Sequence, residues 1–359
     1  MDLTALVWLV LGLVVLTIGA EFLVRGASRL AATAKIPPLV IGLTVVAFGT
    51  SAPELAVSVK SALAGQPDIA IGNVVGSNIC NILLILGLSA SVAPLIVSAQ
   101  LVRLDVPLMI GAALLMYGMA LDGQISRTDG LILAGCLVAY TVFTIRQGRL
   151  LGLAAAAAAP AAPSTAAGQI LIDLGFLLLG LAGLVIGAGW FVDAATSMAR
   201  AFGVSELVIG LTIVAVGTSL PELAASVVAS LKGERDIAVG NVVGSNLFNI
   251  LCVLGITATA SPTGVAVADA ALSFDIPVMT AVSIACLPVF LRGHRIDRWE
   301  GFVVLGYYVA YTAYLVLAAT DHESANAFAT VMRWFVLPLT GLTLGIMMAR
   351  AWRVRRRSP

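Results

Sequence analysis

The chain has 359 residues, of which 60% are hydrophobic and 11% are charged, and its formal net charge is +1. Soluble domains carry roughly 25% charged residues, so this composition excludes a soluble protein and indicates one that crosses a membrane many times. The near-neutral balance, without a basic stripe, also excludes nucleic acid as a partner. All the cysteines lie in apolar runs without paired spacing, which predicts buried small side chains and no disulfide or zinc site. They are Cys80, Cys136, Cys252 and Cys286.

Apolar runs of about 20 residues, the length that crosses a bilayer, recur eleven times along the chain. The first five are expected near residues 3–23, 39–62, 69–91, 101–121 and 129–146. A second five are expected near 170–192, 207–231, 237–260, 269–291 and 300–319, and a final one near 327–349. Residues 148–168, rich in alanine and proline, are expected to link the two sets, either as a flexible linker or as a short alanine helix.

The distribution of lysine and arginine predicts the orientation. With the N-terminus outside, sixteen of these residues fall on the inner face and four on the outer face. Cytoplasmic loops carry the excess of positive charge, so the N-terminus is expected outside and the C-terminus in the cytoplasm. The chain is therefore expected to be a multi-pass protein of the plasma (inner) membrane, in contact with lipid.

An internal repeat is the most informative feature of the chain. Residues 40–90 and 208–258 align without a gap at an offset of 168, and 34 of the 51 positions are identical. Outside this block, Gly19-Ala20 aligns with Gly187-Ala188, and Asp105-x-Pro107 aligns with Asp275-x-Pro277. Five spans per copy is an odd number, so the second copy runs through the membrane in the opposite direction. Inverted repeats of this kind are typical of secondary transporters.

The predicted fold is therefore an all-α integral membrane protein with two inverted-topology repeats of five transmembrane helices plus an extra C-terminal helix. The expected divisions follow the repeat. They are a first repeat at 1–147, a cytoplasmic linker at 148–168, a second repeat at 169–320, and an additional helix with a basic cytoplasmic tail at 321–359.

Each copy carries Gly-Thr-Ser-x-Pro-Glu within an apolar run, at residues 49–54 and 217–222. A proline inside a helix removes one backbone N–H and clashes with the carbonyl four residues earlier, so each helix should break or kink here. The carbonyl groups released by a break need a partner where water is scarce, and a bound cation would suit them. Thr50 and Glu54 share one helical face at i, i+4 spacing, and the Ala47 carbonyl can point the same way.

Glu54 and Glu222 are the acidic residues that lie farthest from a span end. A carboxylate at the bilayer centre is costly, so it indicates a functional site. The alternative is a protonated or paired structural glutamate, but no lysine or arginine lies at a comparable depth to pair with either residue.

Each copy also carries Gly-Asn-Val-Val-Gly-Ser-Asn, at 72–78 and 240–246. Asn73, Ser77 and Asn81 then fall at i, i+4, i+8 on one helical face, as do Asn241, Ser245 and Asn249. Such stripes can also join helices to one another, an alternative that applies most to Asn73, Asn78 and their repeat equivalents. Ser77, Asn81, Ser245 and Asn249 are better placed as ion ligands.

The collected side chains are hard oxygen donors with a formal charge of −2, which balances one Ca²⁺. Calcium takes six to eight oxygen ligands, whereas soft metals prefer cysteine or histidine, and smaller sets of these oxygens could hold Na⁺.

No nucleophile–base pair or histidine-rich motif indicates an intramembrane enzyme. A cation channel would need a pore ring from several subunits, whereas this site is completed within one chain, so a monomer is sufficient for transport. The oligomeric state is left open, and no cofactor is expected beyond the transported Ca²⁺ and Na⁺.

The two motifs, present in both halves, resemble the α-repeats of the sodium/calcium exchanger family, the cation/calcium antiporters, in its prokaryotic form. The resemblance covers the ten-span core. It implies alternating access and competition of several Na⁺ with one Ca²⁺ for overlapping positions. It also implies that calcium would be bound by Glu54, Glu222 and the carbonyl groups of Thr50 and Thr218. Sodium would use Ala47, Thr50, Ser51, Ser77 and Glu222, and, across the repeat axis, Ala215, Thr218, Ser219, Ser245 and Glu54, with Asn81 and Asn249 completing the central position.

The chain departs from the family pattern in two places. Potassium-dependent and some prokaryotic members carry Asp at the position of Asn249, so the asparagine argues against potassium coupling. The linker at 148–168 is too short for the large regulatory domains of animal members. The expected function is thus an antiporter that exchanges Na⁺ for Ca²⁺, electrogenically, in the direction of calcium extrusion. The alternative is a proton/calcium exchanger, which ranks second because proton-coupled relatives usually lack this Ser- and Thr-rich motif.

Overall fold

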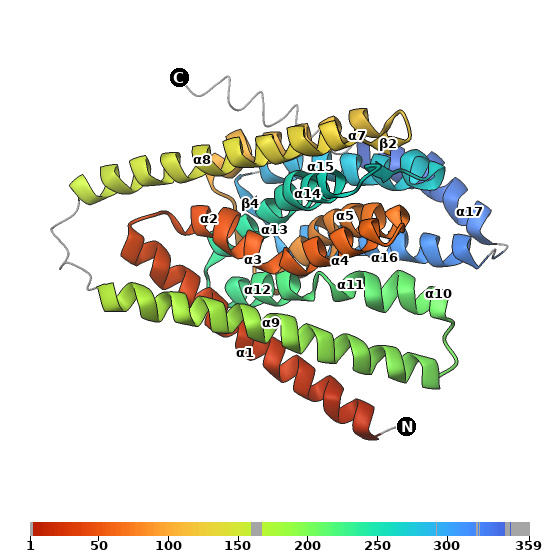
Figure 1. Ribbon diagram of the computed structural model, residues 1–359, viewed down its shortest axis with the longest axis horizontal. Coiled ribbons are helices and arrows are strands. Elements are labelled where there is room, and N and C mark those ends of the chain that lie inside the picture. The colour runs from red at the N-terminus through yellow and green to blue at the C-terminus, as the bar shows by residue number, and fades with distance from the viewer. Residues whose placement is uncertain are drawn as a thin grey trace.

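The computed structural model describes residues 3–158, 167–291, 293–320, 322, 324–341 and 345. It is a bundle of helices with four two-residue strands (Figure 1). The helices of the first half are α1 (Leu3–Ala34), α2 (Pro38–Ile41), η1 (Gly42–Val46), α3 (Ala47–Thr50), α4 (Ala52–Leu63), α5 (Pro67–Cys80), η2 (Asn81–Leu86), α6 (Gly87–Val92), η3 (Leu101–Asp105), α7 (Val106–Ala120) and α8 (Arg127–Ala158). Elements labelled η are single π-helical turns, which commonly occur at functional sites.

The second half repeats this order. Its helices are α9 (Ala167–Ala201), α10 (Glu206–Ile209), η4 (Gly210–Val214), α11 (Ala215–Gly217), α12 (Leu220–Leu231), α13 (Arg235–Phe248), η5 (Asn249–Leu254), α14 (Gly255–Ala260), η6 (Ala271–Asp275), α15 (Ile276–Leu291) and α16 (Arg298–Ala319). The π-helical turns η1, η2 and η3 thus have counterparts in η4, η5 and η6. The inverted-repeat fold predicted from the sequence is confirmed.

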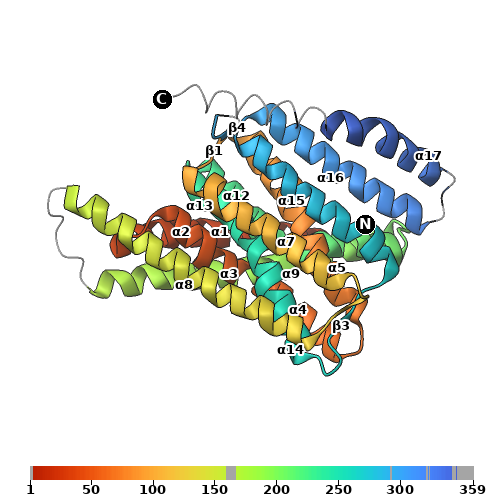
Figure 2. The same ribbon diagram turned by 90° about the horizontal axis from the view of Figure 1, so that it is seen from above.

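Within the described residues, eight helices are long and apolar enough to cross a membrane, and a ninth, Pro38–Leu63, consists of two helices bent by 43°. The counterpart of the ninth, α10 to α12, is divided into shorter pieces. The eleventh predicted span begins with α17 (Ser324–Val331) and η7 (Met332–Val336), and most of its remainder lies outside the described residues. Figure 2 shows α16 and α17 together at one side of the bundle, with α8 and α9 extending from the other.

Two short antiparallel ladders mark the two ends of the bundle. β1 (Leu95–Ile96) pairs with β4 (Arg295–Ile296), and β2 (Gln124–Ile125) pairs with β3 (Val265–Ala266). In each ladder, a loop that follows the third long helix of one repeat meets a loop that follows the fourth long helix of the other. Only an inverted second copy places these loops at the same end, so the ladders give independent support to the inversion. We refer to these ends as the β1–β4 end and the β2–β3 end.

Glycines allow α1 and α9 to cross in direct backbone contact. A Cβ atom at Gly19 would lie 2.6 Å from the Leu184 nitrogen, and one at Gly26 would lie 2.7 Å from the Leu177 nitrogen. Small residues permit such close approach between helices in lipid, where apolar burial contributes little to association. This packing explains why Gly19 and Gly187 occupy equivalent positions in the two copies.

The core of the bundle is α13, whose residues from Ile237 to Phe248 are all buried. The first alanines of the expected linker continue α8 as far as Ala158, which agrees with the helical alternative for this stretch, and residues 159–166 lie outside the described part of the chain. The expectation for the cysteines needs correction. Cys136 is exposed on α8, whereas the other three cysteines are buried. A helix at the edge of a membrane bundle presents apolar residues to lipid, so an apolar run alone does not predict burial.

Candidate functional site

The helix that carries each Gly-Thr-Ser-x-Pro-Glu motif breaks at its serine, as predicted. Ser51 separates α3 from α4 with φ −81° and ψ 5°, and Ser219 separates α11 from α12 with φ −90° and ψ 6°. Pro53 and Pro221 follow in the first turn of the next helix, where a missing N–H costs no hydrogen bond. Each break places a glutamate in the first turn of a helix at the centre of the bundle.

The two glutamates are bound to serines of the opposite repeat. The Ser51 hydroxyl donates to Glu222 Oε1 at 3.1 Å, and the Ser219 hydroxyl donates to Glu54 Oε1 at 3.3 Å. Both carboxyl groups are fully buried, and each second oxygen, Oε2, has no protein partner. Among the described residues, no cationic side chain forms an ion pair with either glutamate. A buried carboxylate needs a compensating charge, so this arrangement suits a cation placed between the repeats.

Asparagines hold the broken helices together with a second set of reciprocal bonds. The Thr50 hydroxyl lies 3.2 Å from Asn241 Oδ1, and the Thr218 hydroxyl lies 3.3 Å from Asn73 Oδ1. The Asn73 amide donates to the Glu54 carbonyl at 3.1 Å, and the Asn241 amide donates to the Glu222 carbonyl at 3.4 Å. Both asparagines therefore join helices to one another, which is the alternative role that the sequence left open for them.

Several other polar atoms of these segments are buried without protein partners. These atoms are Ser77 Oγ, Ser245 Oγ, Asn246 Oδ1, Asn249 Oδ1 and both the oxygen and the nitrogen of Asn81. Buried polar groups are almost always paired, so a cluster of unpaired ones points to a ligand. All but one are oxygens, and the Asn249 amide nitrogen donates to Asn78 Oδ1 at 3.2 Å, which leaves the Asn249 oxygen free. This donor set suits a hard cation.

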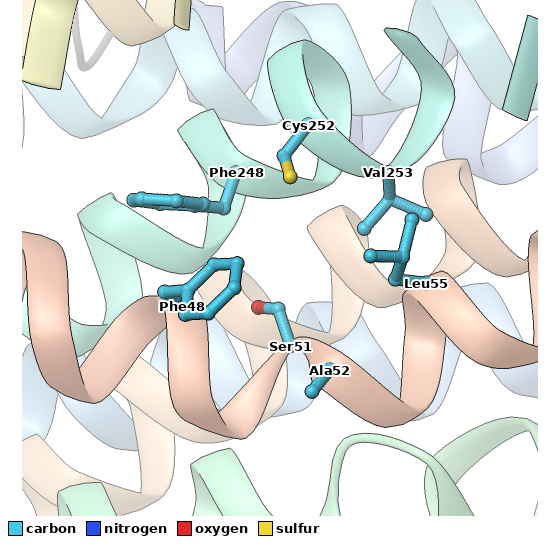
Figure 3. Close-up of a pocket in the computed structure, with 7 residues that line it drawn as sticks. All are labelled: Phe48, Ser51, Ala52, Leu55, Phe248, Cys252 and Val253. Atoms are coloured by element: carbon cyan, nitrogen blue, oxygen red, sulfur yellow. The ribbon is translucent and has the colours of Figure 1, made fainter. Parts of the chain in front are cut away.

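A small cavity lies beside Ser51. It measures about 10 Å³, which is room for about one water molecule. Figure 3 shows the Ser51 side chain pointing into it, with the rings of Phe48 and Phe248 on one side and Leu55 and Val253 on the other. The two ring centroids are 5.8 Å apart. The equivalent positions in the other half are Val216 and Cys80, so the aromatic pair has no counterpart.

The site is closed more tightly towards the β1–β4 end than towards the β2–β3 end. Cβ atoms at Gly240 and Gly244 would lie within 3.0 Å of atoms of α2, η1 and α3, whereas Gly72 and Gly76 have no neighbour within 4 Å. Ala47 and Thr50 are fully buried, but their equivalents are less so. Ala215 is exposed and Thr218 is half-buried. The two repeats therefore differ in how tightly their broken helices pack against the central helices. All twelve predicted site residues lie on the two broken helices and the two central helices α5–η2 and α13–η5.

Sequence reasoning missed two carboxyl groups away from this site, Asp105, which is buried, and Asp275, which is half-buried. Tyr140 donates to Asp105 at 3.2 Å, and Tyr311 donates to Asp275 at 2.9 Å. The signal in the sequence is the Asp-x-Pro pattern that both halves carry. Among the described residues, no group of three or more His, Cys, Asp or Glu side chains could hold a metal ion. A cation at the main site would therefore depend on two carboxylates and neutral oxygens.

The inverted repeats, the broken helices and the buried carboxylates where the repeats meet define a secondary transporter, not an enzyme. The sequence model described as "Sodium/calcium exchanger protein" matches residues 4–146 and 172–317. The chain belongs to the sodium/calcium exchanger family and is a multi-pass cation/calcium antiporter.

Several relatives cover most of the chain. The "Putative antiporter CaxA" of Alkalimonas amylolytica is 41% identical over 86% of this chain and 98% of its own length. The "Sodium/calcium exchanger MaX1" of Methanosarcina acetivorans is 35% identical over 86% and 97%, respectively. A solved structure of the sodium-calcium exchanger NCX_Mj, soaked with 2.5 mM Na⁺ and 0.1 mM Ca²⁺, is 32% identical with a TM-score of 0.74 and covers 87% of this chain and 99% of its own.

Proposed function

We propose that the protein exchanges Na⁺ for Ca²⁺ through one site that is reached alternately from the two ends of the bundle. The observation that supports this most directly is the reciprocal pairing of Ser51 with Glu222 and of Ser219 with Glu54, with Oε2 of each glutamate unpaired. Two buried carboxylates would balance one Ca²⁺. The relatives named as sodium/calcium exchangers support the choice of ions.

The ion ligands belong to this proposal. Ca²⁺ would lie between Glu54 and Glu222 and use the carbonyl groups of Thr50 and Thr218. The sodium positions would overlap the calcium position. They would use Ser51, Ser77, Ala47 and their equivalents Ser219, Ser245 and Ala215, with Asn81 and Asn249 at the centre. The unpaired oxygens of Ser77, Ser245 and Asn249 support these assignments, because they need a partner that the protein does not supply.

The deciding experiment is Ca²⁺ uptake by sealed vesicles that contain the purified protein. An outward Na⁺ gradient should drive uptake, and a pH gradient of equal driving force should not. Uptake driven by the pH gradient alone would favour proton coupling instead, which is the second candidate because one relative is named only as an antiporter.

We further propose that the N-terminus lies outside the plasma membrane, that the C-terminus is cytoplasmic, and that one chain is sufficient for transport. The β1–β4 end would then face the cytoplasm, and the more open β2–β3 end would face the exterior. A cysteine introduced at Gln124 of β2, in a background without other cysteines, should react with a membrane-impermeant thiol reagent added from outside. A cysteine introduced at Arg295 should not, and the reverse result would invert the orientation.

A further inference from the structure

The outer parts of α1 and α9 diverge beyond their glycine contacts (Figure 1). A cleft lined by residues of both helices lies there. It has a volume of about 320 Å³. The residues that line it are Thr4, Ala5, Trp8, Trp190, Asp193, Ala194 and Ser197. The cleft lies near the β2–β3 end, far from the ion site on the broken helices.

Two tryptophans form the walls of this cleft. The Trp8 and Trp190 rings are 5.1 Å apart with an interplanar angle of 67°, so they meet edge to face. Both indoles line the cleft. The face of an indole attracts a cation, and pairs of aromatic faces are used to bind ammonium groups.

The polar lining favours a positive ligand. Asp193 is exposed, and no described residue forms an ion pair with its carboxylate. The Ser197 hydroxyl donates to the Asp193 carbonyl at 2.9 Å, which leaves the Ser197 oxygen able to accept a hydrogen bond. Among the described residues that line the cleft, none is cationic. A single carboxylate beside two indoles provides too few oxygens for a Ca²⁺ or Mg²⁺ ion but suits an organic ammonium group.

The surroundings of the cleft point to a lipid as the source of that group. Tryptophans are enriched at the level of the lipid head groups. Next to the cleft, α1 and α9 expose the large apolar side chains Val7, Leu11 and Ile186. A lipid could place its ammonium head in the cleft and its acyl chains along these residues, whereas a soluble ammonium compound would leave them unused.

We propose that the Trp8–Trp190–Asp193 cleft binds the ammonium head group of a zwitterionic lipid such as phosphatidylethanolamine. The bound lipid bridges α1 and α9 at the end where the two helices diverge beyond their glycine contacts. This inference does not depend on which ion the transporter couples to calcium.

The test measures lipid retention by the purified full-length protein, taken from vesicles of phosphatidylethanolamine and phosphatidylglycerol and examined by native mass spectrometry. The wild type should retain phosphatidylethanolamine in preference to phosphatidylglycerol. Asp193→Asn and Trp190→Ala should each lower that preference by about tenfold. This corresponds to about 1.4 kcal/mol. Trp334→Ala is the matched control, because Trp334 is a strongly exposed tryptophan of η7 outside the cleft.

Three results would overturn the proposal. They are an unchanged lipid preference in Asp193→Asn and Trp190→Ala, an equal loss in Trp334→Ala, or displacement of the lipid by millimolar ethanolamine, which would identify a site for soluble ammonium compounds. Because lipid retention is measured without a Ca²⁺ or Na⁺ gradient, failure of this test is distinct from failure of the proposed exchange.

Discussion

Glu21 of α1 forms an ion pair with Lys232, the residue that follows α12, and the repeat contains no equivalent pair at the opposite end of the bundle. The related positions are Gly189 and Ala64. If the two access states are related by exchange of the repeats, an ion pair without an equivalent stabilises only one of them. That state is the one described here, with the β1–β4 end closed.

A neighbouring hydrogen bond behaves differently. The Ser28 hydroxyl donates to Glu234 Oε1 at 2.7 Å, and the repeat provides Thr196 and Gln66 at the related positions. The Thr196 hydroxyl is buried without a partner in this structure. It could therefore gain the equivalent bond when the β2–β3 end closes. The hydrogen bond can be exchanged between the two states, but the ion pair cannot.

Replacement of Lys232 with alanine, the residue at the related position, should shift the equilibrium towards the state closed at the β2–β3 end. The pair is partly exposed, so we expect no more than about 1 kcal/mol, or about a fivefold change in the ratio of states, and less at high salt. A cysteine introduced at Gly72, in a background without other cysteines, should become slower to label. Lys60→Ala is the control, because Lys60 forms no ion pair among the described residues. An equal effect in both variants would contradict a specific role for the Glu21 pair.

Gly76 and Gly244 should respond oppositely to a large side chain. A Cβ atom at Gly244 would lie 2.8 Å from the Ala47 Cβ atom, whereas one at Gly76 would meet nothing within 4 Å. Gly76→Leu should therefore fold and bind Ca²⁺ but fail to exchange it, because closure of the β2–β3 end would bring the new side chain against Ala215. Overpacking of this kind costs about 1–3 kcal/mol or more, so exchange should fall at least about fivefold.

Gly244→Leu is the matched variant for this experiment. It should lower the thermal stability of the protein, because the structure described here already contains the contact that it disrupts. Calorimetric Ca²⁺ binding and vesicle flux, measured on both variants, separate the two effects. Normal exchange by Gly76→Leu would show that the second state is not a repeat-exchanged copy of the first.

The sequence predicts the spans, the inversion and the helix breaks because each follows from a local property: apolar length, repeat parity or a proline after Thr-Ser. It could not predict which end is closed. Gly72 and Gly240 lie in nearly identical segments, so local reasoning assigns them identical surroundings, and the difference arises only from how the whole bundle packs. The bonds from Ser51 to Glu222 and from Ser219 to Glu54 join residues more than 160 positions apart, and no local pattern specifies such pairs.

Replacement of either Glu54 or Glu222 by glutamine should reduce Ca²⁺ exchange to background. The substitution keeps the shape of the side chain but leaves a bound Ca²⁺ with an uncompensated charge of +1 in a low-dielectric site. The ion-free protein should not lose stability, because neither carboxylate has a cationic partner among the described residues. Asp105→Asn serves as the control, since Asp105 is an equally buried carboxyl group outside the site. Near-normal flux in either glutamate variant would refute the two-carboxylate site.

The charge of the loaded site predicts how exchange depends on membrane potential. Two carboxylates sum to −2, and Asn81 and Asn249 add nothing, so the proposed site is neutral with one Ca²⁺. If three Na⁺ fill the overlapping positions, as the resemblance to sodium/calcium exchangers implies, the loaded site carries +1. The potential would then act on the sodium half-cycle with about 2.3 kcal/mol per charge per 100 mV, and an inside-negative potential would favour calcium extrusion.

Asn249→Asp adds a carboxylate to the centre of the site. If that group is ionised, the sodium-loaded site becomes neutral, and the dependence on potential should move from the sodium half-cycle to the calcium half-cycle. The Asn249 amide donates to Asn78 Oδ1, and a carboxylate cannot make that bond, so we also expect weaker exchange overall. The measurement is Ca²⁺ flux in vesicles whose potential is clamped with valinomycin and potassium. Wild-type flux that does not respond to the clamped potential would rule out the +1 assignment and indicate electroneutral exchange of two Na⁺ for each Ca²⁺.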